Sequence, residues 1–225
     1  MKAVSWPCPA PGGSGEELAL VAGPSAAVAR VLIVPALFED ANRTRRMLVE
    51  TMRALAGRGI ASVLPDMPGC NESLAPLERQ DLASWRAATA AAARHFSTSH
   101  ALSLRGGALV APILPGWQLV PVAGVQVLRP MLRARTVASR EDGRAETMEG
   151  LLDRGRDAGL GLAGYRLGAA MVGDLEAATV PDRPTLGTLK LEDLGGGALW
   201  LRSEPGEDAG LSAALAARVA ADLTP

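Results

Sequence analysis

The stretch His100-Ala-Leu-Ser-Leu-Arg-Gly-Gly107 joins a short apolar segment to a glycine turn. Its first five residues predict a strand, because a short apolar run bounded by turn residues is typical of a strand buried on both faces of a parallel sheet. Upstream, Arg30-Val-Leu-Ile-Val-Pro35 and Ile60-Ala-Ser-Val-Leu-Pro65 have the same character. Three buried strands are therefore expected within residues 30–104.

Helices are predicted between these strands. Residues 42–58 carry apolar side chains at helical spacing, and residues 81–96 begin with an acidic residue and are rich in alanine. Strands that alternate with helices through short links favour a parallel sheet with right-handed crossovers. The fold class is therefore α/β, with a mostly parallel sheet flanked by helices.

The two ends of the chain are less regular. Residues 7–15 are rich in proline, glycine and serine and predict a flexible lead-in, and an early strand is expected at 17–22. After residue 105, prolines interrupt the pattern. The elements expected there are a strand at 117–120, helices at 125–138, 145–157 and 167–178, a short extended piece at 161–165, a last strand near 198–201 and a closing helix at 211–223.

Length and composition limit the class of protein. A chain of 225 residues suits one sizeable domain, and 23 basic against 24 acidic residues show no nucleic-acid footprint. The two cysteines form no disulfide framework, and the chain start lacks the apolar core of a signal peptide. No stretch approaches the roughly 18 apolar residues of a membrane span. We expect one cytoplasmic domain over residues 1–225, with a small helical lid at 122–165.

The turn after residue 104 has the position of a nucleophile elbow. That turn normally reads Gly-x-Ser-x-Gly, because small neighbours allow the strained backbone that presents the serine oxygen. Here Arg105 takes the place of the serine, and Ser103 takes that of the first glycine. Arginine has no nucleophilic oxygen, which closes the acyl-enzyme route at that atom. Ser103 is a minor alternative nucleophile, since it should still lie within the strand.

The histidines also argue against ordinary serine-hydrolase chemistry. His95 and His100 are the two in the chain, and both are expected at the sheet edge opposite the elbow. A hydrolase-fold triad takes its histidine from the segment after the last strand. No histidine follows residue 104, so a Ser-His-acid triad is absent.

One motif suggests a cofactor but fails on its context. Gly159-Leu-Gly-Leu-Ala-Gly164 matches the dinucleotide fingerprint G-x-G-x-x-G. The preceding residues 151–157 are charged and helix-like, whereas that fingerprint requires a buried strand there. We interpret residues 159–164 as a glycine-rich link. P-loop, zinc and EF-hand patterns are absent from the sequence as well, so we expect neither a cofactor nor a metal.

Two loops at the expected carboxyl ends of strands, residues 35–46 and 66–73, are better candidates for a site. Open α/β sheets bind ligands at that edge. Three arginines crowd the start of the helix that follows the first loop, where the helix dipole disfavours them. They would suit an anionic group. The alternative is a structural ion network, in which Glu39 and Asp40 pair with these arginines and with Arg105.

Five segments together resemble the exosortase A system-associated hydrolases. They are residues 34–47, 64–73, 104–107, 128–135 and 162–167, and the similarity is colinear from about residue 30 to 170. The resemblance implies that this family also has an arginine at the elbow position, where Arg105 stands here. The resemblance implies an α/β-hydrolase fold and a link to bacterial exopolysaccharide and envelope-protein sorting. It implies no particular reaction.

The favoured hypothesis is an atypical or inactive hydrolase, a pseudoenzyme without a recognisable triad. It would bind an anionic small molecule, or an envelope-biogenesis partner protein, through Arg105 and the two loops. The binding residues expected there are Phe38, Asn42, Arg46 and Cys70.

Two other functions stay open. In the first, a hydrolase of an ester, thioester or amide uses Asp66 or Glu39 as the base that activates water, and Arg105 polarises the carbonyl. In the second, a structural scaffold docks through the arginine-rich helix at 125–138 and has no concave pocket at the elbow.

Overall fold

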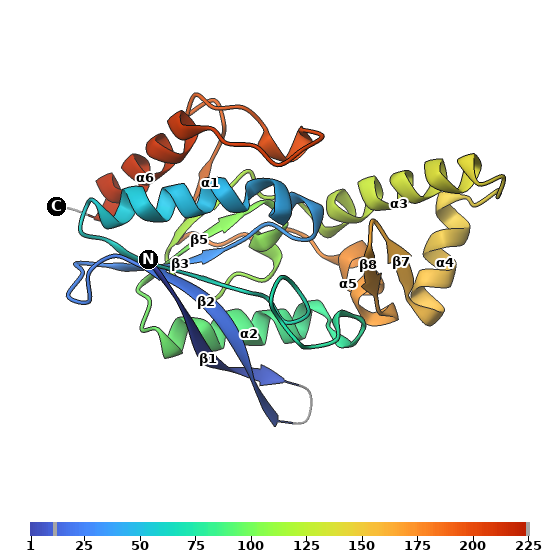
Figure 1. Cartoon of the computed structure of the whole chain (residues 1–225), viewed down its shortest axis with the longest axis horizontal. Helices are drawn as coiled ribbons and strands as arrows, with labels where there is room; N and C mark the ends of the chain where they lie inside the picture. Colours follow the sequence, from blue (N-terminus) through green and yellow to red (C-terminus); the bar gives the residue numbers. More distant parts are fainter. Residues whose placement is uncertain (11–12, 224–225) are drawn as a thin grey trace.

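A seven-stranded sheet forms the centre of the computed structural model, which describes residues 1–10 and 13–223 (Figure 1). The strand order is β1-β2-β4-β3-β5-β6-β9. The strands span Lys2–Ala10 (β1), Gly13–Ala22 (β2), Arg30–Val34 (β3), Ala61–Pro65 (β4), His100–Leu104 (β5), Gly116–Leu119 (β6) and Leu186–Leu189 (β9). β1 and β2 are antiparallel to their neighbours, while β4, β3, β5, β6 and β9 run parallel.

Helices cover both faces of this sheet. Helices α1 (Glu39–Ala56) and α6 (Ala209–Leu223) contact each other on one face, and α2 (Leu82–His95) lies on the other (Figure 1). The apolar stripe predicted for α1 is the buried side of that helix. At the start of α2, Asp81 Oδ1 accepts a hydrogen bond from the backbone N–H of Ser84 at 2.6 Å, which caps the helix. The predicted α/β class, with its mostly parallel sheet, is confirmed.

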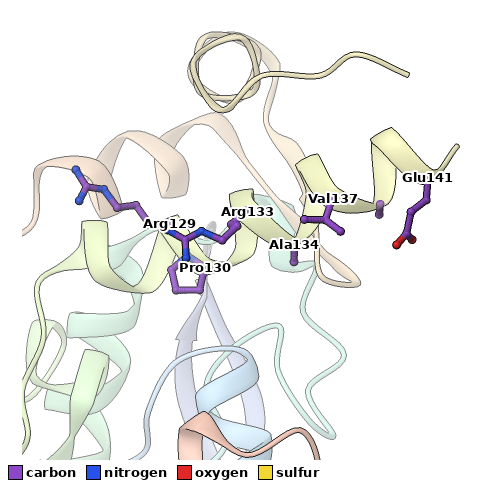
Figure 2. A pocket seen from close by; sticks show the side chains of 7 residues that line it. Arg129, Pro130, Arg133, Ala134, Val137 and Glu141 are labelled. Atoms are coloured by element: carbon purple, nitrogen blue, oxygen red, sulfur yellow. The ribbon is translucent and has the colours of Figure 1, made fainter. Parts of the chain in front are cut away.

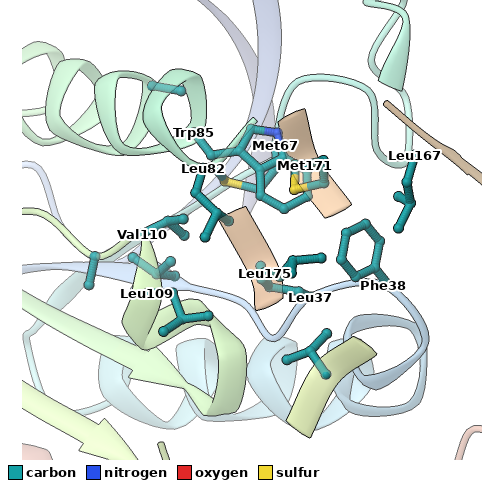
Figure 3. Packing of buried hydrophobic residues seen from close by; sticks show 14 of the residues in the cluster. Leu37, Phe38, Met67, Leu82, Trp85, Leu109, Val110, Leu167, Met171 and Leu175 are labelled. Carbon is teal, nitrogen blue, oxygen red and sulfur yellow. The ribbon is translucent and has the colours of Figure 1, made fainter. Parts of the chain in front are cut away.

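Each face of the sheet packs its own apolar cluster. Leu32 and Val34 of β3 point into one cluster, and Val31 and Ile33 into the other, as the two-residue period of a strand requires. Figure 3 shows the first cluster, where Trp85 of α2 lies among side chains from the loop after β3 and from the region after β6. Burial on both faces explains why β3, β4 and β5 read as unbroken apolar runs.

A long insertion, residues 124–177, lies between β6 and β9. It comprises α3 (Gly124–Glu141), α4 (Met148–Ala158), the hairpin of β7 (Leu160–Leu162) and β8 (Tyr165–Leu167), and α5 (Ala169–Ala177). In Figure 1 it extends to one side of the sheet. The expected lid at 122–165 falls largely within this insertion; its role as a lid stays a prediction. The glycine-rich link at 159–164 forms most of the β7–β8 hairpin.

The flexible lead-in expected at residues 7–15 is wrong for the part that the structure describes. Residues 7–10 belong to β1 and residues 13–15 to β2, and these strands pair along the whole of β1. Residues 11–12 lie outside the described part. Prolines are tolerated in β1 because it is the edge strand, where a missing N–H need not break the ladder.

The last strand is also misplaced in the sequence prediction. Residues 199–201 form a short 3₁₀ helix, η3 (Leu199–Leu201), and the last parallel strand is β9, about ten residues earlier. Leu199 and Trp200 are buried in the second apolar cluster, so their hydrophobicity reflects burial rather than strand pairing.

Two more 3₁₀ helices are η1 (Leu77–Arg79) and η2 (Arg105–Leu109). Over residues 1–10 and 13–223, the helices are too short or too polar to cross a bilayer.

Candidate functional site

Arg105 directly follows β5 and is the first residue of η2, where the chain turns sharply. Its φ angle is +49°, a left-handed conformation that costs a non-glycine residue about 1–3 kcal/mol. The turn is packed against the loop after β3, since a Cβ atom on Gly107 would lie 2.2 Å from the carbonyl oxygen of Pro35. The strand, the strained residue and the close-packed glycine make the geometry of a nucleophile elbow.

The Arg105 guanidinium is held on two sides. Its Nε donates a hydrogen bond to Asp40 Oδ2 at 2.7 Å, and its central carbon lies 4.5 Å from the centroid of the Trp200 ring. The Arg105 and Asp40 side chains are 13% and 20% exposed. In the described chain, the two terminal nitrogens of Arg105 make no hydrogen bond to protein. The structure therefore orients the guanidinium group and, among the described residues, leaves its two terminal nitrogens without a hydrogen-bond acceptor.

A cavity of about 310 Å³ lies beside this group, which we call the Arg105 cavity. The loop after β3, the elbow, α3 and η3 form its walls. Its charged lining residues are Glu39, Asp40, Arg43 and Arg105. Apolar side chains of α3 line the opposite wall, namely Val127, Pro130, Met131 and Ala134. This volume is at the lower end of the range for small-molecule sites.

Ion pairs inside the Arg105 cavity follow the structural network expected as an alternative. Glu39 Oε2 lies 3.5 Å from Arg43 Nη2, one helical turn away, and Asp40 pairs with Arg105. Arg43 Nη1 also donates to the carbonyl oxygen of Trp200 at 2.9 Å, which fixes the residue whose ring covers Arg105. The positive charges of two arginines are therefore balanced by two carboxylates. Within the described residues, the two terminal nitrogens of Arg105 take no part in these pairs.

A smaller cavity of about 40 Å³ lies beside the first and holds Phe38, Asn42 and Cys70. Phe38 immediately precedes α1 and has φ 55° and ψ −127°, which makes it a second strained residue. Its ring centroid is 5.2 Å from that of Tyr165 and 5.5 Å from that of Trp85. Asn42 Nδ2 donates to the Tyr165 hydroxyl at 2.9 Å. These contacts tie the insertion to the loop after β3, in a space that accommodates little more than a water molecule.

Two groups in this smaller cavity stay un-ionised near neutral pH. Burial, with a smaller contribution from the charge of Asp66, raises the pKa of the Cys70 thiol to about 12. Burial, followed by the charge of Glu39, raises the pKa of the Tyr165 hydroxyl to about 12. Cys70 is therefore not a thiolate nucleophile.

Asp66 and Arg46, also expected in the site, do not line the Arg105 cavity. Asp66 is buried; its Oδ1 lies 3.1 Å from Arg45 Nη2 and accepts a hydrogen bond from Asn71 at 2.8 Å. Arg46 is exposed and pairs with Glu207. The structure thus brings together Arg105, Glu39 and Phe38 around one cavity, with Asn42 and Cys70 next to it.

The remaining triad candidates are far from catalytic geometry. Ser103 is buried in β5, and its hydroxyl donates to the Trp117 carbonyl at 3.5 Å. His100 begins β5, at the opposite end of that strand from Arg105. Its ring stacks on that of Trp117, with the two ring centroids 5.7 Å apart. His95 ends α2 and contacts Phe96. Around Arg105, the described residues therefore assemble no Ser-His-acid triad.

Sequence reasoning missed Trp200 and the wall contributed by α3. Trp200 was expected in a strand, and a 3₁₀ helix instead directs its ring over the elbow.

A second groove, of about 560 Å³, runs along α3 from Arg129 to Glu141 and shares Pro130 and Ala134 with the Arg105 cavity (Figure 2). In Figure 2 its side chains stand along one side of the helix, with arginines near the start and Glu141 at the end.

Comparisons with known proteins bear on the fold. No family model and no curated protein matches the chain. Est1E from Butyrivibrio proteoclasticus, solved with ferulic acid bound, matches with a TM-score of 0.52 and 17% identity, over 78% of this chain and 74% of that one.

Two other solved structures are less similar. A thermophilic esterase from Thermogutta terrifontis, with malate bound, has a TM-score of 0.45 and 18% identity, and the match covers 60% of this chain. An α/β serine hydrolase without lid from Xanthomonas campestris has a TM-score of 0.41 and 17% identity, and the match covers 55% of this chain. The chain spans 53% and 63% of the lengths of these two proteins. From its strand order and its likeness to Est1E, the chain has the α/β-hydrolase fold.

Proposed function

We propose that this protein is an atypical α/β-hydrolase-fold protein that binds a small anionic molecule at Arg105 and has no serine-hydrolase activity. The observation that carries the proposal is the guanidinium at the elbow. Asp40 and Trp200 hold it, Arg105 lines a cavity, and its two terminal nitrogens have no hydrogen-bond partner in the described chain. Two parallel N–H groups suit a carboxylate or a phosphate, which accept such a fork in a bidentate manner.

Backbone strain supports a functional role for this place. Phe38 and Arg105 both adopt positive φ angles, and both line the Arg105 cavity. Such strain is kept where the surrounding structure enforces it, and it concentrates at binding and catalytic sites. The apolar wall from α3 further suggests a ligand with a hydrocarbon part beside its anionic group.

The biological setting rests on sequence resemblance alone. It favours a bacterial exopolysaccharide and exosortase context and a cytoplasmic location, with an envelope-biogenesis protein as the alternative partner. The insertion at residues 124–177 would then act as the lid of the Arg105 cavity, because α3 forms one of its walls.

A carboxylate-base hydrolase is the second candidate, and the lining of the Arg105 cavity favours Glu39 over Asp66 as its base. Glu39 lines the Arg105 cavity, whereas Asp66 is held outside it by Arg45 and Asn71. The scaffold alternative expects no concave pocket at the elbow. The cavity of about 310 Å³ beside Arg105 therefore argues against it.

The test is thermal unfolding of the purified protein with simple anions, namely benzoate, hexanoate and phenyl phosphate. At about 100 times its Kd, a ligand stabilises a protein by about 2.7 kcal/mol. At least one probe should raise the Tm of the wild type but not of Arg105→Gln. Arg46→Gln is the matched control, because it removes the same charge from an exposed ion pair outside the cavity.

An esterase and thioesterase screen of the same variants tests the rival. Turnover that both Arg105→Gln and Glu39→Gln abolish would overturn the binding proposal in favour of a hydrolase. Equal stabilisation of the wild type and Arg105→Gln by every anion would also overturn it, because the anions would then bind elsewhere.

A further inference from the structure

A separate cavity of about 400 Å³ lies between the β1–β2 hairpin and the connection from β4 to α2. We call it the Glu17 cavity. It shares no lining residue with the Arg105 cavity. Figure 1 shows this hairpin projecting from the edge of the sheet past α2. The Glu17 cavity is therefore a second site that the proposed function does not use.

Glu17 is the group in this cavity that calls for a partner. Its side chain is buried, at 7% exposed, yet within the described residues it forms no ion pair with a basic side chain. Its Oε1 accepts a hydrogen bond from the Ser73 hydroxyl at 2.7 Å. Burial, and to a lesser extent the nearby charge of Asp66, raises the pKa of Glu17, although the Ser73 hydrogen bond opposes this. A buried carboxylate without a cation is unfavourable.

The rest of the lining is mainly apolar. Its apolar members are Cys8, Pro9, Ala10, Pro68, Leu74, Ala75 and Pro76, and a second acid in the lining, Glu16, is exposed to solvent. Gln80, which is buried, uses its amide within the protein: Nε2 donates to the Pro76 carbonyl, and Oε1 accepts from Ser84. The exposed Arg79 also lines the cavity but forms no ion pair in the described chain. Glu17 is thus the buried group with a charge to offer.

We propose that the Glu17 cavity binds a small organic amine, with its ammonium group paired to the Glu17 carboxylate and its hydrocarbon part packed on the prolines. A cation supplies the missing partner of the buried acid, and charge-assisted hydrogen bonds are about twice as strong as neutral ones. The cavity volume limits the occupant to the size of an ordinary small ligand.

Calorimetric titration with cyclohexylmethylamine and with cyclohexylmethanol, its neutral counterpart, tests this proposal. The amine should bind the wild type at least about tenfold more tightly than the alcohol. It should lose at least about tenfold in affinity in Glu17→Gln, which keeps the side-chain shape and an acceptor for Ser73. Glu72→Gln is the control, because Glu72 is exposed in the same connection and does not line the cavity.

A second variant guards against an effect of Glu17→Gln on folding. Ala75→Met fills the cavity while Glu17 stays in place, and it should abolish binding of the amine. The proposal is overturned if the amine fails to bind the wild type, if the alcohol binds equally well, or if Glu17→Gln binds the amine as the wild type does. None of these outcomes depends on Arg105.

Discussion

Replacement of Asp40 by asparagine separates the structural and the binding roles of the elbow. Asp40 holds Arg105 through a 2.7 Å hydrogen bond to Nε, and both side chains are largely shielded from solvent. Asparagine keeps an acceptor oxygen at nearly the same place but removes the negative charge. The substitution should therefore destabilise the fold and, at the same time, leave the Arg105 charge available to an anion.

The expected magnitude follows from the burial of this pair. Exposed ion pairs contribute about 0–1 kcal/mol, and breaking a fully buried pair costs about 3–5 kcal/mol. With side chains 13% and 20% exposed, and with the hydrogen bond retained, we expect Asp40→Asn to lower the free energy of unfolding by about 1–2 kcal/mol. Affinity for phenyl phosphate should rise about tenfold, which corresponds to about 1.4 kcal/mol.

Urea unfolding measures the stability, and titration with phenyl phosphate measures the affinity. Glu39→Gln is the matched control, because Glu39 occupies the same first turn of α1 and faces the same helix dipole. Its i,i+4 pair with Arg43 is worth about 0.3–0.5 kcal/mol, so its loss should be small. Equal stability losses in both variants, or an unchanged anion affinity in Asp40→Asn, would refute the role assigned to the Asp40–Arg105 pair.

Three further predictions concern other parts of the molecule. Tyr165→Phe removes the hydrogen bond from Asn42 and should lower the free energy of unfolding by about 0.5–1.5 kcal/mol. Amide exchange in β7 and β8 should also become faster, and unchanged exchange rates would contradict the link between the insertion and the loop after β3. Because the pKa of Glu17 is raised on folding, its ionisation destabilises the protein as pH rises above the unfolded value of about 4.3. Glu17→Gln should therefore gain stability relative to the wild type between pH 4 and pH 7 in urea unfolding, and a constant difference would exclude this linkage. Alkylation of Cys70 by iodoacetamide at pH 8 should be at least about a hundredfold slower in the native protein than in urea, since its pKa is about 12; equal rates would show an accessible thiolate.

Local sequence pattern was sufficient for the central α/β unit. β3, α1, β4, α2 and β5 lie close to their predicted positions, because buried strands and amphipathic helices each leave a distinct apolar period. The same local reasoning placed Arg105 at a strained glycine turn, where the structure gives it φ +49°. The absence of a triad also needed only the sequence, since both histidines precede the elbow.

Long-range contacts decided the parts where prediction failed. The composition of residues 7–15 favours a loop, yet pairing of β1 with β2 makes them strands at the sheet edge. The apolar run at 198–201 has no period that distinguishes a strand from a buried turn. Only packing against α1 and the sheet makes it the 3₁₀ helix that carries Trp200.

The candidate site divides in the same way. The sequence by itself determined which residue stands at the elbow and that it lacks a nucleophilic oxygen, because these follow from residue identity within a local motif. Only the tertiary structure decided that Asp40 and Trp200 hold Arg105, that Glu39 joins its cavity, and that Asp66 and Arg46 do not. Side-chain pairing depends on where helices and loops from distant parts of the chain come to lie, and local periodicity carries no information about that.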